Sequence, residues 1–293
     1  MRLFNGFLVM LLAFLVPGNL AQAAFHFMQI EQVIGGVNGD TTAQAVQLRM
    51  RIAGQNVMSM SRLVVVDATG SNPIVLKDMT SNVANSAAGS RVLLTTSNFA
   101  SYTDIPLVTD FVMDPIPASY LAAGQLRFMD DFSTIYWSLS WGGAGYTGST
   151  TGSMTNDSNG IFGPPVNIAL PSTTLQALRF TGTAAQLSTN NLAQYALTTG
   201  AAVFTNNANT SFTVVAPGDF NGDGEVNAAD YVAWRKNDDS QARYDTWRAH
   251  FGETTGIGAG SAGVSPSHAA VPEPATLVLL FTSALLATRR RRL

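Results

Sequence analysis

Short runs of apolar residues, separated by glycine, asparagine, serine, threonine and proline, occupy most of the chain from Ala24 to about Val215. Many short runs at this spacing, without a long amphipathic stretch, are typical of strands in two packed sheets. We therefore predict a mainly β chain with an antiparallel β-sandwich over residues 24–215. The predicted strands are Phe25–Ile34, Ala45–Ile52, Leu63–Asp67, Ile74–Lys77, Arg91–Thr95, Leu107–Met113, Gln125–Phe128, Thr134–Trp141, Val166–Leu170, Leu178–Gly182, Ala201–Thr205 and Ser211–Val215.

The pattern changes to a helical spacing after this region. Ala228–Asn237 is predicted as a helix, and a second helix carries Tyr244, Trp247 and Phe251 on one side. We expect a small α-helical module over residues 217–252, followed by a flexible glycine-, serine- and alanine-rich linker over 253–270.

Residues 1–23 have the three-part pattern of a signal peptide. Arg2 gives a positively charged start, residues 7–16 are uninterruptedly apolar, and Pro17 ends the run. The small residues that a signal peptidase accepts follow, so cleavage is predicted at the site formed by Ala21, Ala23 and Ala24. A buried N-terminal helix is the alternative, but such a helix has a polar face that this segment lacks.

The other end of the chain, residues 271–293, also has three parts. Pro272, Glu273 and Pro274 precede an apolar run over 275–288, and arginines occupy 289–292. This tail resembles the PEP-CTERM sorting signal, which implies recognition by an exosortase. As a helix the run spans roughly 21 Å, short of a hydrocarbon core of about 30 Å. The arginines predict a cytoplasmic C-terminus, so the body is exported to the cell envelope, cell surface or extracellular matrix. An ordinary tail anchor in the membrane is the alternative.

Charge and composition narrow the function classes. The chain has 16 basic and 19 acidic residues and no cysteine. Without the five basic residues and one acidic residue of the two end segments, 11 basic and 18 acidic residues remain, a net charge near −7. An acidic body predicts no nucleic acid partner, and the lack of cysteine excludes disulfides, thiolate zinc sites and a cysteine nucleophile.

Catalytic constellations are weak in this sequence. His26, His250 and His268 lie in three separate segments, so we expect no histidine-based triad or metal cluster. Asp130 and Asp131 are adjacent, and adjacent residues on a strand point to opposite faces. We therefore predict no enzymatic activity. The alternative is an extracellular carbohydrate-binding or polysaccharide-active protein displayed by the same tail.

An aromatic stripe within Thr134–Trp141 leaves two interpretations open. Ile135, Trp137, Leu139 and Trp141 share one face of the predicted strand. Trp137 and Trp141 could stack on sugar rings of an extracellular polysaccharide. The regular interleaving with aliphatic residues favours the core-facing side of the sheet instead.

The sharpest chemical signal is the twelve-residue segment from Asp219 to Asp230. It places oxygen-bearing side chains at positions 1, 3, 5, 9 and 12 and glycine at position 6. Ca²⁺ takes six to eight oxygen ligands, and loops of this spacing wrap such ligands around one ion. Glu225 stands where a backbone carbonyl ligates, and an acidic turn without metal is the alternative. The predicted Ca²⁺ ligands are Asp219, Asn221, Asp223, Glu225, Asn227 and Asp230.

This segment and the helix after it resemble a type I dockerin repeat over about 217–252. The motif comprises the loop ending in aspartate, Tyr231 and the Trp234-Arg235 pair; Tyr244 and Trp247-Arg248 repeat the helix without a second calcium loop. The resemblance implies Ca²⁺-dependent folding and a cohesin-like partner contacted through Ala228 and Ala229.

The body carries a second resemblance. The rhythm of Gln29–Val33, Ala45–Arg49 and Gly89–Leu94 is similar to lamin-tail-type immunoglobulin sandwiches. This similarity implies a binding or structural domain, so we expect the sandwich to be of the immunoglobulin or jelly-roll kind.

Overall fold

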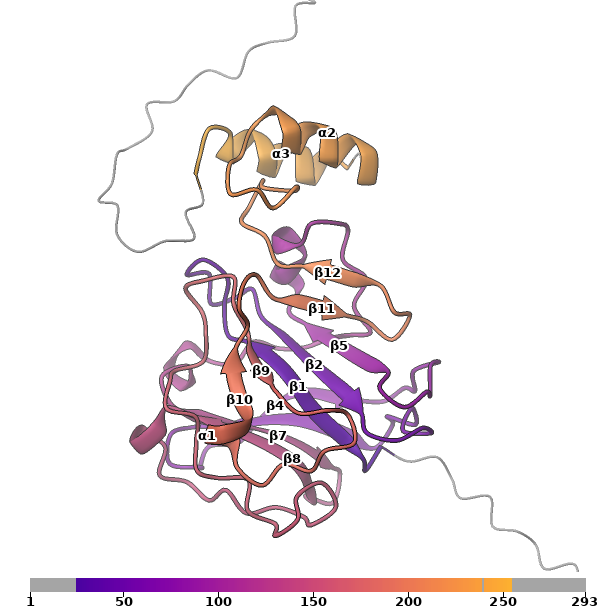
Figure 1. Ribbon diagram of the computed structural model, residues 1–293, viewed down its shortest axis with the longest axis vertical. Helices are drawn as coiled ribbons and strands as arrows, with labels where there is room; N and C mark the ends of the chain where they lie inside the picture. The colour runs from indigo at the N-terminus through magenta and orange to yellow at the C-terminus, as the bar shows by residue number, and fades with distance from the viewer. Residues whose placement is uncertain (1–24, 239, 255–293) are drawn as a thin grey trace, which may run out of the picture.

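The computed structural model describes residues 25–238 and 240–254, and these form a mainly β body with a small helical C-terminal part (Figure 1). Short 3₁₀ turns occupy Ser97–Tyr102, Ala118–Tyr120 and Gly143–Gly145. The strands and α-helices are β1 (Met28–Ile34), β2 (Ala45–Met50), β3 (Ser61–Val66), β4 (Ile74–Met79), β5 (Arg91–Thr95), β6 (Phe111–Val112), β7 (Gly124–Asp130), β8 (Ile135–Trp141), β9 (Leu178–Phe180), α1 (Asn191–Gln194), β10 (Tyr195–Leu197), β11 (Val203–Thr205), β12 (Ser211–Thr213), α2 (Ala228–Asn237) and α3 (Gln241–His250).

The strands form two main sheets and one hairpin. The six-stranded sheet has the order β10-β9-β1-β2-β5-β6, and the four-stranded sheet has the order β4-β3-β7-β8. Neighbouring strands run antiparallel except β5 and β6, which are parallel. β11 and β12 pair with each other as a separate hairpin.

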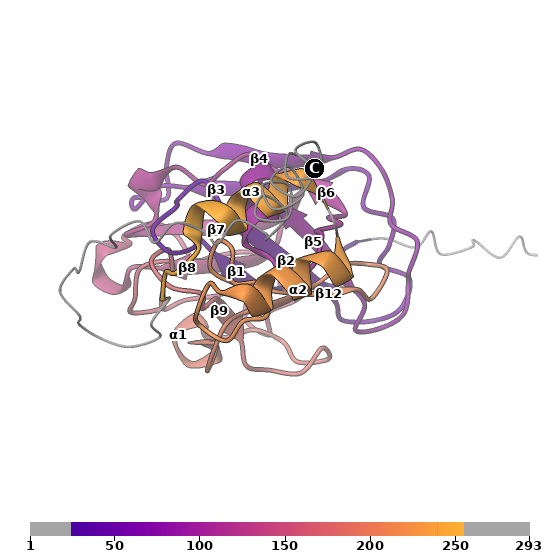
Figure 2. The same ribbon diagram turned by 90° about the horizontal axis from the view of Figure 1, so that it is seen from above.

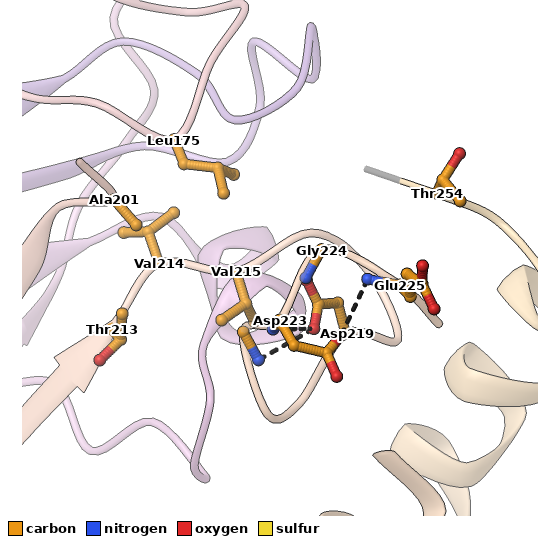
Figure 3. Close-up of a pocket in the computed structure, with 11 residues that line it drawn as sticks. Leu175, Ala201, Thr213, Val214, Val215, Asp219, Asp223, Gly224, Glu225 and Thr254 are labelled. Carbon is orange, nitrogen blue, oxygen red and sulfur yellow. Dashed lines mark hydrogen bonds between the residues drawn. The ribbon is translucent and has the colours of Figure 1, made fainter. Parts of the chain in front are cut away.

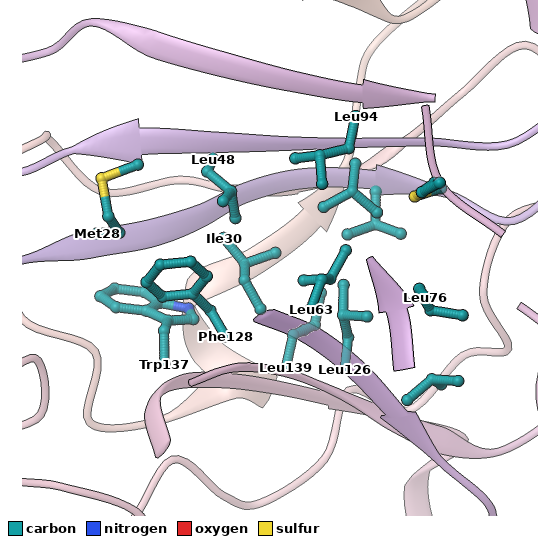
Figure 4. Close-up of a cluster of buried hydrophobic side chains, with 14 of the residues drawn as sticks. Met28, Ile30, Leu48, Leu63, Leu76, Leu94, Leu126, Phe128, Trp137 and Leu139 are labelled. Carbon is teal, nitrogen blue, oxygen red and sulfur yellow. The ribbon is translucent and has the colours of Figure 1, made fainter. Parts of the chain in front are cut away.

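The main core lies between the two sheets. Ile30, Leu48 and Leu94 come from the six-stranded sheet, and Leu126 and Leu139 come from the four-stranded one (Figure 4). These side chains are fully buried, and burying one such aliphatic side chain contributes about 1.5–3 kcal/mol. Alternation along each strand directs every second residue into this layer, which is the pattern that the sequence displays.

The outer face of the six-stranded sheet is covered at one end. Phe204 and Phe212 of the β11–β12 hairpin pack against Ile34, Ala45 and Leu93 on that face. Both faces of β1, β2 and β5 are therefore buried here, which explains why their burial does not alternate.

The helical part follows β12 directly and lies at one end of the β body (Figures 1 and 2). α2 and α3 pack on each other through Trp234 and Trp247, and Phe220 and Val226 of the preceding loop complete this small core. Among the described residues, no helix has the length and apolar character needed to cross a membrane.

The mainly β character and the helices after residue 217 are confirmed, but some predicted strands are wrong. Val166–Leu170 forms no strand; Val166 makes only an isolated bridge to Trp141. Leu107–Met113 is reduced to the two residues of β6. There, Asp110 Oδ2 accepts a hydrogen bond from the Leu93 amide (2.7 Å), and the Thr109 hydroxyl donates to the Leu93 carbonyl (2.9 Å). Side chains thus share this part of β5 with a backbone bond from the Asp110 amide to the Leu93 carbonyl (3.0 Å).

The remaining predicted segments lie outside the described residues. These are the signal peptide of residues 1–23 with its cleavage site, most of the linker, and the sorting tail with Pro272, Glu273 and Pro274.

Candidate metal centre

The loop from Asp219 to Asp230 curls around the carboxylate of its first residue. Asp219 Oδ1 accepts hydrogen bonds from the backbone amides of Gly222 (2.9 Å) and Asp223 (3.2 Å), and Oδ2 accepts one from Gly224 (3.1 Å; Figure 3). Gly222 and Gly224 have φ values of 72° and 90°, a left-handed conformation that glycine adopts without a steric penalty. The glycines therefore permit the tight path that brings successive amides to Asp219.

Positions 3 and 5 of the loop continue this arrangement. Asn221 Oδ1 accepts from the amide of Asp223, and Asp223 Oδ1 accepts from the amide of Glu225, both at 2.9 Å. Asn221 Nδ2 also donates to Asp223 Oδ2 (2.8 Å). Each side-chain oxygen retains a second lone pair after such a bond, so the hydrogen bonds fix these oxygens without using up their ligand capacity.

The last two predicted ligands join the loop to α2. Asn227 is the N-cap of the helix, and its Oδ1 accepts from the Ala229 amide (2.7 Å). Asp230 is fully buried, and its two oxygens accept from the amides of Asn221 (3.0 Å) and Asn227 (2.8 Å). Position 12 thereby ties position 3 to position 9, and the loop is closed by the same capping box that starts the helix.

The loop has two buried carboxylates, Asp219 and Asp230, and two exposed ones, Asp223 and Glu225. Asp219 is only 2% exposed, and burial raises the pKa of its carboxyl, with the charges of Asp230 and Asp223 acting in the same direction. Like charges that are removed from water repel each other strongly. A bound cation would offset this repulsion and so favour the ionised form of the Asp219 carboxyl. The atoms that these positions would offer to a metal ion are all oxygens. Such a ligand set suits Ca²⁺ and not a metal that prefers nitrogen or sulfur.

In the part of the chain that the structure describes, no three histidine, aspartate or glutamate side chains are already gathered as a ligand cluster. The carboxylates at positions 1, 5 and 12 instead each accept hydrogen bonds from backbone amides of the loop. The donor set therefore fits the ion by residue type and spacing.

The second half of the loop, at residues 225–226, pairs with residues 252–254, a contact that the sequence analysis did not predict. Glu225 forms an isolated antiparallel bridge with Thr254, and the Val226 amide donates to the Glu253 carbonyl (2.9 Å). The Gly252 amide donates back to the Val226 carbonyl (2.8 Å). The segment after α3 thus pairs with the loop before α2, and this pairing holds the start of α2 next to the end of α3.

A cavity of about 370 Å³ separates the loop from the β body. Asp219, Asp223 and Glu225 line one side of it, and Leu175 and Val215 line the other (Figure 3). The acidic loop is therefore accessible from solvent at this junction.

The two tryptophans considered for sugar stacking lie in the core. Trp137 and Trp141 are both fully buried. Trp137 Nε1 donates to the Tyr195 hydroxyl (2.7 Å), and Trp141 Nε1 donates to the Tyr120 carbonyl (2.9 Å). Neither indole offers a face to a sugar, so the ligand-stacking interpretation of these residues is corrected to a packing role.

The paired carboxylates have separate structural partners. Asp130 accepts hydrogen bonds from the amides of Phe132 and Thr134 and from the Tyr136 hydroxyl. Asp131 forms an ion pair with Arg62 at 2.8 Å. Asp130 closes a turn and Asp131 lies on the surface, so the two acids do not face one substrate site.

Comparison with protein-family models, with curated proteins and with solved structures finds no match.

Proposed function

We propose that this chain is an exported, non-enzymatic protein of the cell surface or extracellular matrix that binds one Ca²⁺ in the Asp219–Asp230 loop. Its two sheets would form an antiparallel β-sandwich of the immunoglobulin or jelly-roll kind, with a structural or adhesive role. The shared core between the sheets supports this architecture. The signal-peptide pattern and the PEP-CTERM-like tail support export, cleavage by signal peptidase and sorting by an exosortase.

The observation that carries the metal proposal is the closed ring of hydrogen bonds around Asp219 and Asp230. Asp219, Asn221, Asp223 and Asp230 would hold the ion through side-chain oxygens, Glu225 through its carbonyl, and Asn227 at position 9. Ca²⁺ would neutralise the three carboxylates and connect the loop to α2. Because the helical part has a core of only a few aromatic and aliphatic side chains, we expect its folding to depend on the ion.

Two kinds of partner fit this proposal. Ala228 and Ala229 are exposed at the start of α2, where a cohesin-like protein would contact a dockerin-like module. An extracellular polysaccharide is the second kind, contacted through the β body.

The metal proposal is tested by calorimetric titration of the purified exported protein with Ca²⁺. We expect one ion per chain, together with a gain of helical signal in circular dichroism. Asp223→Asn keeps the size of the side chain and should weaken binding at least about tenfold, because a carboxylate ligand is lost. Asp245→Asn removes an equal charge from the exposed side of α3 and should leave the affinity unchanged. Absence of binding, or equal affinity in the Asp223→Asn variant, contradicts the metal site.

The sorting proposal has its own test. Replacing Pro272, Glu273 and Pro274 by alanine should leave the C-terminal tail attached and change where the protein accumulates. Intact-mass spectrometry of the envelope and surface fractions measures both effects. An unaltered mature mass and location would exclude exosortase processing.

A further inference from the structure

A β-bulge in β1 directs two consecutive polar residues to the same side of the six-stranded sheet. The pairing of β1 with β2 shifts between Ile30 and Gln32, so Glu31 is the extra residue. Glu31 bonds to side chains of β2 and β5, and Gln32 Nε2 donates to the Val203 carbonyl of the covering hairpin (2.6 Å). Both side chains therefore lie on the outer face. Bulges re-aim side chains in this way and are frequent beside functional sites.

Three arginines converge on the carboxylate of Glu31, which is itself fully buried. Its Oε1 lies 2.9 Å from Arg49 Nη1, 3.2 Å from Arg91 Nη2 and 3.8 Å from Arg179 Nη2. Its Oε2 accepts hydrogen bonds from Arg91 Nε and Gln47 Nε2, both at 2.7 Å. These residues stand on β9, β1, β2 and β5, four consecutive strands of one sheet. We call Arg49, Arg91, Arg179 and Glu31 the arginine cluster.

The cluster carries an excess of positive charge. Three guanidinium groups face one carboxylate, which leaves two charges uncompensated. Burial lowers the pKa of Arg49, and the nearby charges of Arg91 and Arg179 oppose the attraction of Glu31. Holding like charges together away from water is unfavourable unless an anion neutralises them. The β body as a whole has seven basic and ten acidic residues over 25–215, so this local concentration of basic groups indicates an external anionic partner.

Within the arginine cluster, Arg49 is held in place by hydrogen bonds, whereas Arg91 and Arg179 are partly exposed to solvent. Arg49 is held by Gln29 Oε1 (2.7 Å) and the Gly182 carbonyl (2.9 Å), so its position is fixed. The side chains of Arg91 and Arg179 are 32% and 51% exposed. At 3.8 Å, Arg179 is beyond hydrogen-bond distance from Glu31, so its donors are available to a ligand. A guanidinium presents paired donors that match a carboxylate or sulfate.

A polar cavity lies beside β5 and is linked to the cluster through the backbone of Arg91, although none of the four cluster side chains lines it. Asn207 Nδ2 donates to the Arg91 carbonyl (3.0 Å), and Asn207 also lines a cavity of about 570 Å³. Asn82, Asn85, Asn209 and Thr109 line the same cavity, together with Asp110, whose Oδ2 accepts hydrogen bonds from the amides of Leu93 and Asn207. Amide and hydroxyl groups are partners for sugar hydroxyls, whereas a phosphodiester chain would gain little from them.

We propose that the arginine cluster binds acidic groups of a polysaccharide, with Arg91 and Arg179 contacting a uronate carboxylate or a sulfate and the amide-lined cavity receiving the adjoining sugar. The choice of an extracellular polysaccharide rests on the proposed export, whereas the anion site itself rests on geometry alone.

The test is calorimetric titration of the purified exported protein with oligogalacturonates, sulfated dextran oligosaccharides and neutral dextran. EDTA is present throughout, so that the calcium loop contributes nothing and the result is independent of the metal proposal. We expect binding of an acidic oligosaccharide, no binding of dextran, and a lower affinity at higher salt. Comparing the titrations with oligogalacturonates and with sulfated dextran shows whether the cluster binds a carboxylate or a sulfate.

Arg179→Gln is the decisive variant because its side chain is half exposed and lies beyond hydrogen-bond distance from Glu31. It should weaken binding at least about tenfold, and Arg91→Gln should act in the same direction. Lys77→Gln removes an equal charge from β4 in the other sheet and should change the affinity less than twofold. Equal losses in the Arg179 and Lys77 variants, or no binding of either acidic oligosaccharide, overturn the proposal. Tighter binding of single-stranded DNA that also depends on Arg179 would overturn the assignment to a polysaccharide.

Discussion

Single side chains fix several turns of the β body, and Asp67 at the end of β3 is the clearest case. Its Oδ1 accepts hydrogen bonds from the Thr69 amide (2.9 Å), the Thr69 hydroxyl (2.7 Å) and the Ser71 amide (3.0 Å), and Oδ2 accepts one from Asn72 Nδ2 (2.6 Å). The carboxylate thus supplements the backbone bonds of this turn, in which the Asp67 amide donates to the Ser71 carbonyl and the Gly70 amide donates to the Asp67 carbonyl. The hydrogen bonds from the side chains of Asn72 and Thr69 lower the pKa of Asp67 to about 2.

This shift predicts a defined dependence on pH. Because the pKa of Asp67 in the folded chain lies below its ordinary value of 3.8, the carboxylate stabilises the fold above pH 4. The contribution declines as the pH falls from about 4 and is lost below about 2. The difference in free energy of unfolding between the natural chain and Asp67→Asn should therefore shrink across this window. Denaturant unfolding at several pH values measures it, and NMR titration of Asp67 gives the pKa directly. A constant difference from pH 6 to pH 2 would contradict the assignment.

At the scale of elements, the pattern of apolar residues predicted strands and helices correctly where the buried side chains follow the period of the strand or helix. The structure forms β8 with Trp137, Leu139 and Trp141 inside the core, as the alternation predicts. The prediction was wrong for Ile135, because the pairing with β7 shifts by one residue at the start of β8 and Tyr136 joins the core instead. Ala228–Asn237 was predicted with both ends correct, because Asn227 and Asp230 supply a capping box that is local in sequence.

Elements defined by distant contacts escaped prediction. β10 is three residues long, and Tyr195 at its start is fixed by partners on other strands: its hydroxyl accepts from Trp137 and donates to the Ile30 carbonyl (2.6 Å). The residues near Tyr195 in the sequence do not predict these contacts. The bulge at Glu31 escaped for the same reason, because a shift in pairing depends on the neighbouring strand. The predicted calcium ligands, by contrast, lie within twelve consecutive residues, so their proximity depends on local sequence alone.

At the scale of the whole molecule, Arg243 of α3 connects the helical part to the β body. Its Nη2 donates to the Asp104 carbonyl (2.9 Å), its Nε lies 3.2 Å from Asp238 Oδ2, and its guanidinium stands 4.2 Å from the centre of the Phe220 ring. Asp104 is itself paired with Thr213 of β12 through both backbone and side chain. One largely buried side chain therefore contacts the Asp219–Asp230 loop at Phe220, the end of α2 at Asp238, and the β body at Asp104.

This connection predicts how calcium acts on the molecule. An ion that binds only the folded loop stabilises it by about 4 kcal/mol at a thousand times its Kd. With Arg243 in place, we expect part of that stabilisation to reach the β body, so that calorimetry shows one broad transition moving upward with Ca²⁺. Arg243→Met keeps much of the bulk but removes the ion pair with the Asp238 carboxylate, which among the described residues retains only the Ser240 hydroxyl, and leaves the Asp104 carbonyl without its donor, a loss of about 3 kcal/mol. The helical part should then melt separately, and Ca²⁺ should shift only that transition. Arg248→Met changes an exposed arginine on the same helix and should behave like the natural chain. If the β transition of the Arg243→Met variant still rises with Ca²⁺, the coupling runs through other contacts, such as the bridge between Thr103 and Val214.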